Sequence, residues 1–199
     1  MKKVFFVLIF FLAIFTGDNA VATILASGEE YYCEEGYNVL IAYFSPSGII
    51  GKVAKNLSQG ILELSQKTYG IRESADLFEI KPEQSYTIEM HDENIRPVLT
   101  DKLESPDKYN MIFIGYPLWL GRAPAIVDTF LETYDFYNAK VIPFTISEKD
   151  SSDAVPFTKT GTLSDKNIKV KSGYYFHGDM THAQFADRVG FDIMFMCAE

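Results

Sequence analysis

The segment Val39–Ile50 constrains the fold of this chain more than any other part of the sequence. It begins with an apolar run rich in β-branched residues, breaks at a short Ser/Pro/Gly turn and continues as a helical pattern from about Ile49. This order is typical of a buried strand that leads into a helix through a hydroxyl-rich loop. The first backbone N–H groups of a helix lack partners and carry partial positive charge, so such a loop suits a phosphate group. A tight strand–helix turn without a ligand is the alternative interpretation.

The rest of the chain repeats this alternation of apolar runs and amphipathic segments. We expect strands at 38–44, 75–80, 111–115, 140–144 and, at an edge, 168–176. We expect helices at 49–66, 125–133 and 183–197, with shorter ones at 98–103 and near residue 153. Strands that are continuous apolar runs separated by amphipathic helices indicate a parallel sheet covered on both faces. The sequence therefore predicts one doubly wound α/β domain without internal repeats.

The N-terminus has the features of a signal peptide. Residues 1–3 are basic, Val4–Phe15 is unbroken apolar sequence, and Ala20-Val21-Ala22 offers a small-x-small cleavage site. The apolar run is shorter than the roughly 20 residues that a membrane-spanning helix needs. We therefore expect an exported protein, secreted or periplasmic, in which 1–22 is the signal peptide, 23–37 a polar linker and 38–199 the domain. An uncleaved N-terminal membrane anchor is the alternative.

The charge of the chain limits its partners. The formal net charge is −9, and removal of residues 1–22 takes away two lysines and one aspartate, which makes the remainder one unit more acidic. This acidity argues against nucleic acid and anionic membrane surfaces as partners, and it would accommodate a basic protein partner. Solubility alone is the simplest explanation of the acidity.

The cysteines and histidines do not form a metal-binding pattern. The chain has two cysteines, Cys33 and Cys197, and three scattered histidines, His91, His177 and His182. There is no Cys-x-x-Cys motif and no Cys/His cluster with ligand spacing, so we expect no zinc site. Each histidine is expected to be a surface or half-buried side chain and not a ligand.

Three loops leave the carboxyl ends of the predicted strands, at residues 45–50, 116–123 and 145–152. Ligands of doubly wound sheets bind outside these strand ends, where the strand order reverses. The loops bring together hydroxyls, amides and a tryptophan with a tyrosine, but no nucleophile–base pair and no convergent carboxylates. A site of this composition suits a cofactor that carries the chemistry itself.

At these loops the sequence resembles the flavodoxin family, in particular a bacterial flavodoxin-like branch with AYFSxSG and GYPxWxGxAP motifs. The matching segments are Ala42–Gly48, Ala75–Ile80 and Gly115–Glu132, and smaller matches occur at Arg96-Pro97 and Ile142-Pro143-Phe144. The likeness spans about residues 39–147. It implies a five-stranded sheet of order 2-1-3-4-5 with helices on both faces, and non-covalently bound FMN.

The resemblance also implies which residues would hold the flavin. In the first loop Ser45 and Ser47 would donate hydroxyls to the phosphate, together with the amides of Gly48, Ile49 and Ile50. In the second loop the residues flanking the isoalloxazine would be Tyr116, Pro117, Leu118, Trp119 and Gly121, with Trp119 as the stacking ring. Ordinary packing is the alternative role of Trp119. The third loop would line the other flavin edge with Thr145, Ile146 and Ser147.

Two positions depart from the pattern of the family. Ile50 stands where a threonine hydroxyl usually contacts the phosphate, and Glu148-Lys149-Asp150 stands where glycines usually let the backbone approach the flavin. Loss of one neutral hydrogen bond costs roughly 0.5–1.5 kcal/mol, or at most about tenfold in affinity. We interpret Lys149 as a solvated side chain.

Two functions follow as hypotheses. The first is an FMN-binding flavodoxin-like protein that passes electrons to a redox partner protein or reduces a small acceptor such as a quinone, without a catalytic base. The second is a non-enzymatic binding or interaction domain that has kept the fold and lost FMN. The topology implied by the resemblance also places Cys33 and Cys197 at the same end of the molecule, where a disulfide is expected; two unpaired thiols are the alternative.

Overall fold

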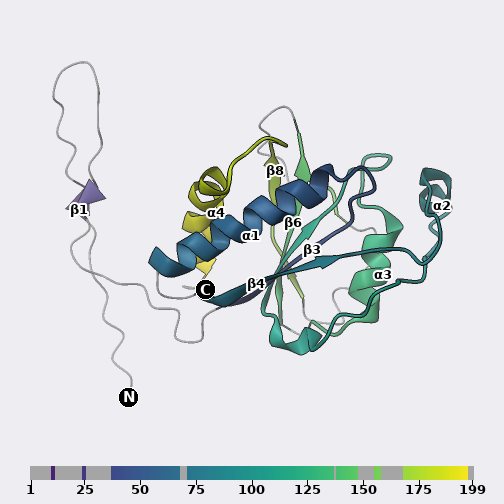
Figure 1. Ribbon diagram of the computed structural model, residues 1–199, viewed down its shortest axis with the longest axis horizontal. Helices are drawn as coiled ribbons and strands as arrows, with labels where there is room; N and C mark the ends of the chain where they lie inside the picture. Colours follow the sequence, from purple (N-terminus) through teal and green to yellow (C-terminus); the bar gives the residue numbers. More distant parts are fainter. Residues whose placement is uncertain are drawn as a thin grey trace.

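A six-stranded sheet forms the centre of the molecule in the computed structural model, which describes residues 10–11, 24–25, 37–67, 71–136, 138–147, 155–157 and 168–196 (Figure 1). All its strand pairs are parallel, and the order is β4-β3-β5-β6-β7, with β8 also pairing β6. The strands are β3 (Tyr37–Tyr43), β4 (Ile71–Glu79), β5 (Met111–Gly115), β6 (Lys140–Ile146), β7 (Lys169–Val170) and β8 (Tyr174–Phe176). In chain order this is the predicted 2-1-3-4-5 arrangement.

Helices cover both faces of the sheet, as predicted. The main helices are α1 (Ile49–Lys67), α3 (Ala125–Thr133) and α4 (His182–Met196); α2 (Ile88–Asp92) and the 3-10 helix η1 (Pro106–Lys108) are short. In Figure 1, α1 and α4 lie side by side on one face and α3 lies on the other. No helix in the described part of the chain is long and apolar enough to cross a membrane.

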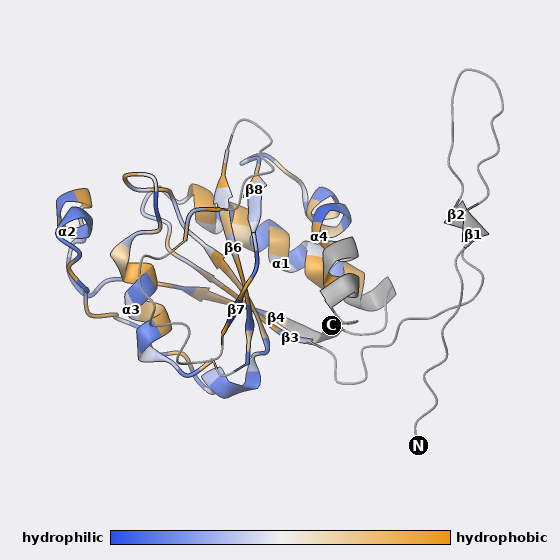
Figure 2. Cartoon of the chain, turned by 180° about the vertical axis from the view of Figure 1, so that it is seen from behind, coloured by the Kyte–Doolittle hydropathy of each residue, from blue (hydrophilic) through white to orange (hydrophobic). Residues whose placement is uncertain are grey.

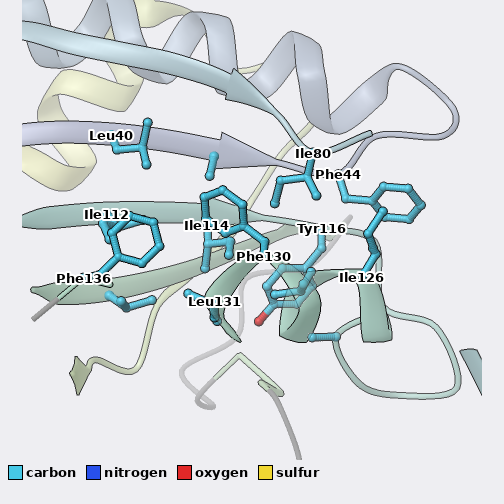
Figure 3. Packing of buried hydrophobic residues seen from close by; sticks show 14 of the residues in the cluster. Leu40, Phe44, Ile80, Ile112, Ile114, Tyr116, Ile126, Phe130, Leu131 and Phe136 are labelled. Atoms are coloured by element: carbon cyan, nitrogen blue, oxygen red, sulfur yellow. The ribbon is translucent and has the colours of Figure 1, made fainter. Parts of the chain in front are cut away.

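The alternation of side chains along the strands explains why a hydrophobic core lies on each face of the sheet. On β3, Val39 and Ile41 pack under α1 and α4, whereas Leu40 and Ala42 pack under α3. Because successive side chains of a strand point to opposite faces, a strand covered on both sides must be apolar throughout. Figure 2 shows apolar colouring along much of the central strands and alternating apolar and polar segments along the helices, and Figure 3 shows the core beneath α3.

The helices α1 and α4 approach each other closely at two glycines. A Cβ placed on Gly60 would lie 2.5 Å from the carbonyl oxygen of His182 and 2.9 Å from the amide nitrogen of Ala186. A Cβ on Gly190 would lie 2.8 Å from a methyl of Leu64. The packing of the last helix beside the first, which the resemblance implies, therefore depends on residues without a side chain.

The fifth strand differs from the prediction of one continuous strand at 168–176. It is divided into β7 and β8, and the break lies beside Pro143 of β6. The carbonyls of Ala139 and Val141 accept hydrogen bonds from the amides of Lys169 and Lys171, 3.0 and 2.9 Å, so alternate residues of β6 face this edge. Pro143 is the next residue on that side and has no N–H, so the ladder is interrupted there.

Other boundaries also differ from the prediction. The helix expected at 98–103 is wrong: Leu99 forms an isolated antiparallel bridge with Pro82, and the helical turns of this crossover are α2 and η1. The second strand begins at Ile71, earlier than expected, and β3 begins at Tyr37. The first strand is shifted by one residue from the prediction, and the second is longer because its parallel pairing with β3 continues beyond the apolar run.

Several predictions fall outside the described residues. These are the cleavage site Ala20-Val21-Ala22, the Cys33–Cys197 disulfide, the charged segment 148–150 and the helical turn near residue 153. Within the N-terminal region, β1 (Phe10–Phe11) pairs antiparallel with β2 (Ile24–Leu25). The cleavage site, the disulfide, the role of the charged segment and the helical turn stay predictions.

The close approach of α1 and α4 gives a stability prediction. Gly60→Ala places a methyl group against the backbone of α4, so we expect a loss of about 1–3 kcal/mol in the free energy of unfolding, despite the better helix propensity of alanine. Chemical denaturation measures this quantity. Gln59→Ala, on the exposed side of the same turn, is the matched control and should change stability by less than about 0.5 kcal/mol. Equal effects of the two substitutions would contradict the account.

Candidate functional site

The three predicted loops leave the sheet side by side. In the register of the sheet, Tyr43 lies beside Gly115 and Gly115 lies beside Phe144. The amide of Phe44 donates to the carbonyl of Gly115, 2.8 Å, and the amide of Tyr116 donates to the carbonyl of Phe144, 3.1 Å. The carboxyl ends of β3, β5 and β6 therefore lie at one level, and the loops that follow them leave the same edge of the sheet.

The first loop is closed by Ser45 and opens toward solvent. The carbonyl of Ser45 accepts from the amide of Gly48, 3.1 Å, and its hydroxyl accepts from the amide of Gly51 in the first turn of α1, 2.9 Å. Gly48 has φ +80°, and a Cβ there would meet no atom within 4 Å. Among the described residues, none accepts a hydrogen bond from the amides of Ile49 and Ile50. The loop therefore leaves two helix-start amides without a protein acceptor.

Side chains of the first loop divide between solvent and core. Ser47 and Ile49 are exposed, whereas Ile50 is 1% exposed and packs in the core beneath α1. The hydroxyl expected at the position of Ile50 is thus replaced by a core side chain. Of the three amides implied for the phosphate, that of Gly48 is already used within the turn, which leaves the other two.

An open hollow of about 430 Å³ adjoins this loop along the outer side of α1. Polar residues form most of its wall: Tyr43, Ser45, Lys52, Lys55, Asn56, Gln59 and Glu79, with Gly48 and Gly51. The two lysines are exposed, and Glu79 is paired with Lys81 at 3.1 Å. Neither lysine is among the residues predicted for the site, because lysines on the exposed face of an amphipathic helix are ordinarily solvated side chains.

The second loop ends in a two-residue turn. Trp119 and Arg122 exchange backbone hydrogen bonds of 3.0 and 3.1 Å, and the two residues between them, Leu120 and Gly121, have φ of +50° and +76°. This conformation resembles a type I′ turn, which favours Asn or Gly at both central positions. Leu120 is nevertheless the first of them, and it is 61% exposed. An exposed, apolar residue thus occupies a strained conformation at the tip of the loop.

Trp119 lies within a cluster of aromatic rings. Its ring stacks on Tyr86 with centroids 5.6 Å apart and an interplanar angle of 23°, and it meets Phe44 edge to face at 5.4 Å. Trp119 itself is half-buried. Protein packing therefore accounts for one face of the indole, and only its accessible part is left for a ligand.

His91 is a buried side chain that contacts the backbone of the second loop. Its side chain is fully buried, its Nδ1 accepts from the amide of Ala125, 3.1 Å, and its Nε2 lies 3.0 Å from the carbonyl oxygen of Trp119. The guanidinium of Arg122 donates to the backbone carbonyl of His91, 3.0 Å. The expectation of a surface or half-buried histidine is wrong for His91, which lies in the irregular crossover and carries no periodic signal.

The remaining predicted residues lie deeper in the structure. The Tyr116 side chain is fully buried and donates to the carbonyl of Pro156, 3.0 Å; burial raises the pKa of its phenol, so the hydroxyl stays neutral. Thr145 is buried, Ile146 packs against the core, and the amide of Ser147 donates to the carbonyl of Phe176, 2.9 Å. Pro117 and Leu118 are half-buried.

Arg96 has a structural role in this region. Its guanidinium pairs with the buried carboxylate of Asp128 at 3.2 Å and makes two hydrogen bonds of 3.2 Å to Glu132. These contacts attach the crossover that carries Tyr86 and His91 to α3. No group of three or more metal-ligating side chains occurs among the described residues.

A family model described as "Flavodoxin" matches residues 38–190. This chain therefore belongs to the flavodoxin family. A comparison with curated proteins gives no match.

Solved structures agree with this assignment. A protein of Bacteroides uniformis ATCC 8492 classed as a flavoprotein is 28% identical with a TM-score of 0.59, and the alignment covers 78% of this chain and 99% of that one. A similarly classed protein of Bacteroides eggerthii DSM 20697 is 26% identical with a TM-score of 0.55, covering 78% and 98%. A WrbA-like flavodoxin of Agrobacterium tumefaciens, 15% identical with a TM-score of 0.51 and covering 82% and 98%, shares the fold.

The strained turn gives a second prediction. Asparagine tolerates positive φ better than leucine, so Leu120→Asn should raise the free energy of unfolding by up to about 1 kcal/mol, with little burial lost. Gly121→Ala, next to it, adds a Cβ at positive φ and should lower stability by about 1 kcal/mol. Thermal or urea unfolding of both variants compares them. A loss of stability in Leu120→Asn as large as that in Gly121→Ala would show that the turn is not strained.

Proposed function

We propose that the three loops at the carboxyl ends of β3, β5 and β6 bind FMN. The observation that carries this proposal is the first loop, where two helix-start amides without a protein acceptor lie beside the exposed Ser47 in a member of the flavodoxin family. A phosphate there gains hydrogen bonds and the favourable field of the helix N-terminus. The exposed lysines at 52 and 55 add positive charge beside it in an otherwise acidic protein.

The residues present fit a flavin mononucleotide in most respects. Ser47 and the amides of Ile49 and Ile50 would hold the phosphate, and the Trp119–Arg122 turn would border the ring system with the indole and Leu120. Ser45 would act chiefly by closing the loop, because its hydroxyl already accepts from Gly51. When bound, FMN supplies the one- and two-electron chemistry, so the protein needs no catalytic acid or base.

The protein would use this cofactor to pass electrons to a partner or to reduce a small acceptor such as a quinone. Its own residues bind the phosphate, exclude water from one side of the ring and set the polarity around it. Purified protein that oxidises NAD(P)H with a quinone as acceptor would act as a reductase. Flavin reduction that depends on a separate redox protein would identify a carrier.

The replacement of a phosphate-contacting hydroxyl by the core residue Ile50 favours a second candidate function. A domain of this fold without FMN would serve as a binding or interaction module. Titration of FMN with the apoprotein separates the two functions. Quenching of flavin fluorescence together with a protein-bound flavin spectrum supports the first, and an unchanged FMN signal at saturating protein supports the second.

Two serines in the first loop give a matched test of the phosphate site. Ser47 is exposed, so Ser47→Ala should weaken FMN by about three- to tenfold and leave stability unchanged, through loss of one hydrogen bond. Ser45→Ala removes the hydrogen bond from the Gly51 amide to the Ser45 hydroxyl, so it should lower the free energy of unfolding by about 1 kcal/mol. Flavin titration and denaturation of both variants measure these effects. An unchanged FMN affinity in Ser47→Ala would remove this hydroxyl from the site.

We also propose that the protein is exported with loss of residues 1–22. The basic start, the apolar run and the Ala20-Val21-Ala22 site support this proposal. N-terminal sequencing of protein recovered outside the cytoplasm should begin at Thr23. Recovery of intact Met1 in the membrane fraction would instead indicate an uncleaved anchor.

A further inference from the structure

His91 connects three parts of the molecule that meet beside the candidate flavin site. It belongs to α2, which lies in the crossover between β4 and β5, and its ring bridges the turn at Trp119 and the first residue of α3. Pro124, the residue before α3, has no side-chain acceptor for the helix amides. The Nδ1 atom of His91 takes this capping role for the amide of Ala125.

These contacts assign the protonation state of the ring. The amide of Ala125 is a donor, so Nδ1 must accept and carries no proton. The single ring proton therefore lies on Nε2, which donates to the carbonyl of Trp119 at 3.0 Å. A second proton, on Nδ1, would face an N–H group and the positive end of α3, and both disfavour it.

The same carbonyl of Trp119 also accepts from the amide of Arg122, 3.1 Å, in the turn's own pair of hydrogen bonds. His91 thus holds the turn at its first residue, while the Arg122 side chain holds it to the carbonyl of His91. The turn contains the unfavourable positive φ of Leu120, so it depends on such external contacts.

The charged groups around the ring do not replace these contacts. The charged residues of α2, the turn and α3 are Glu89, Asp92, Arg122, Asp128 and Glu132, and Arg96 pairs with the last two. Glu89 and Asp92 are exposed, and Asp128 is already paired with Arg96 at 3.2 Å. Arg122 brings positive charge to the backbone of His91, which adds to the cost of a charged imidazole. Tyr86, stacked on Trp119, is kept neutral by burial, which raises the pKa of its phenol.

We propose that His91 is a positioning residue for the Trp119–Arg122 turn, and that the turn keeps its place only while the imidazole is neutral. Protonation would break the Nδ1 contact with Ala125 and release the turn from α3, which makes the local geometry dependent on pH. The expected effect of pH on flavin affinity rests on the proposed function. The expected effect of pH on the surroundings of Trp119 does not depend on flavin binding.

Trp119 is the only tryptophan in the chain, so its emission reports on the turn directly in the apoprotein. Because burial, the amide of Ala125 and the positive end of α3 all disfavour a charged ring, the transition should come below the range in which exposed histidines titrate. Between about pH 6 and pH 4 we therefore expect a change in Trp119 emission while the far-UV circular dichroism stays constant. His91→Gln should show altered emission already at pH 7 and no further transition. His182→Gln is the matched control, because His182 is a half-exposed histidine at the start of α4 whose ring is paired with Glu63 of α1 at 3.0 Å. This variant should behave as wild type.

Three outcomes would overturn the proposal: emission of the wild type that does not change in this range, a transition that persists in His91→Gln, or a change that coincides with loss of secondary structure. Because His91→Gln could fail to fold, the wild type provides an independent test. Histidine-selective ¹⁵N NMR should show His91 as the neutral Nε2–H tautomer at pH 7. A charged ring or the Nδ1–H tautomer would contradict the assignment.

Flavin titration forms the last part of the experiment. FMN affinity of His91→Gln should be about tenfold weaker than that of the wild type at pH 7. The two affinities should converge at the pH where the wild-type emission has changed, because protonation of the FMN phosphate near pH 6 weakens binding equally in both proteins. If FMN does not bind at pH 7, the proposed function fails, and the emission and NMR results still decide the role of His91. If FMN binds with the same affinity in wild type and His91→Gln at both pH values, the positioning role fails alone.

Discussion

The parallel register of β3, β5 and β6 is the constraint on which the candidate site depends. Two hydrogen bonds fix it at the carboxyl ends, from Phe44 to Gly115 and from Tyr116 to Phe144. Gly115 lies between these strands, and a Cβ on it would come within 2.2 Å of the Phe144 ring. The three strand ends can lie level because this position carries no side chain. A shift of one residue would exchange the two faces of a strand and bury its polar loop residues.

Each face of the sheet supports a different half of the site. On the side of α1 and α4, the core holds Ile50 and so fixes the start of α1, where two amides lack a protein acceptor. On the side of α3, the core holds Tyr86 and His91 behind Trp119, and Arg96 attaches their crossover to Asp128. The first half offers charge and hydrogen-bond donors, and the second offers an aromatic and apolar wall. A phosphate-bearing aromatic ligand matches this division.

The parts of the fold that depend on local pattern could be predicted from the sequence. The strand, loop and helix of Val39–Ile50, the sheet order and the last helix beside the first were all expected, because apolar periodicity and the family motifs fix them. The division of the fifth strand could have been expected from Pro143, whose missing N–H faces that edge. The residues that hold Trp119 in place could not be predicted in this way. Tyr86 and His91 lie in an irregular segment, and only the tertiary structure brings them beside residue 119.

If the loops after β3, β5 and β6 form one flavin site, FMN must perturb residues of separate loops together. The most direct measurement is a ¹H–¹⁵N NMR titration of the isotope-labelled apoprotein with FMN. We expect the largest shifts at the amides of Ser47, Ile49 and Ile50 and at the Trp119–Arg122 turn, with the indole N–H among them. Shifts confined to another surface, or no shifts at millimolar FMN, would contradict it.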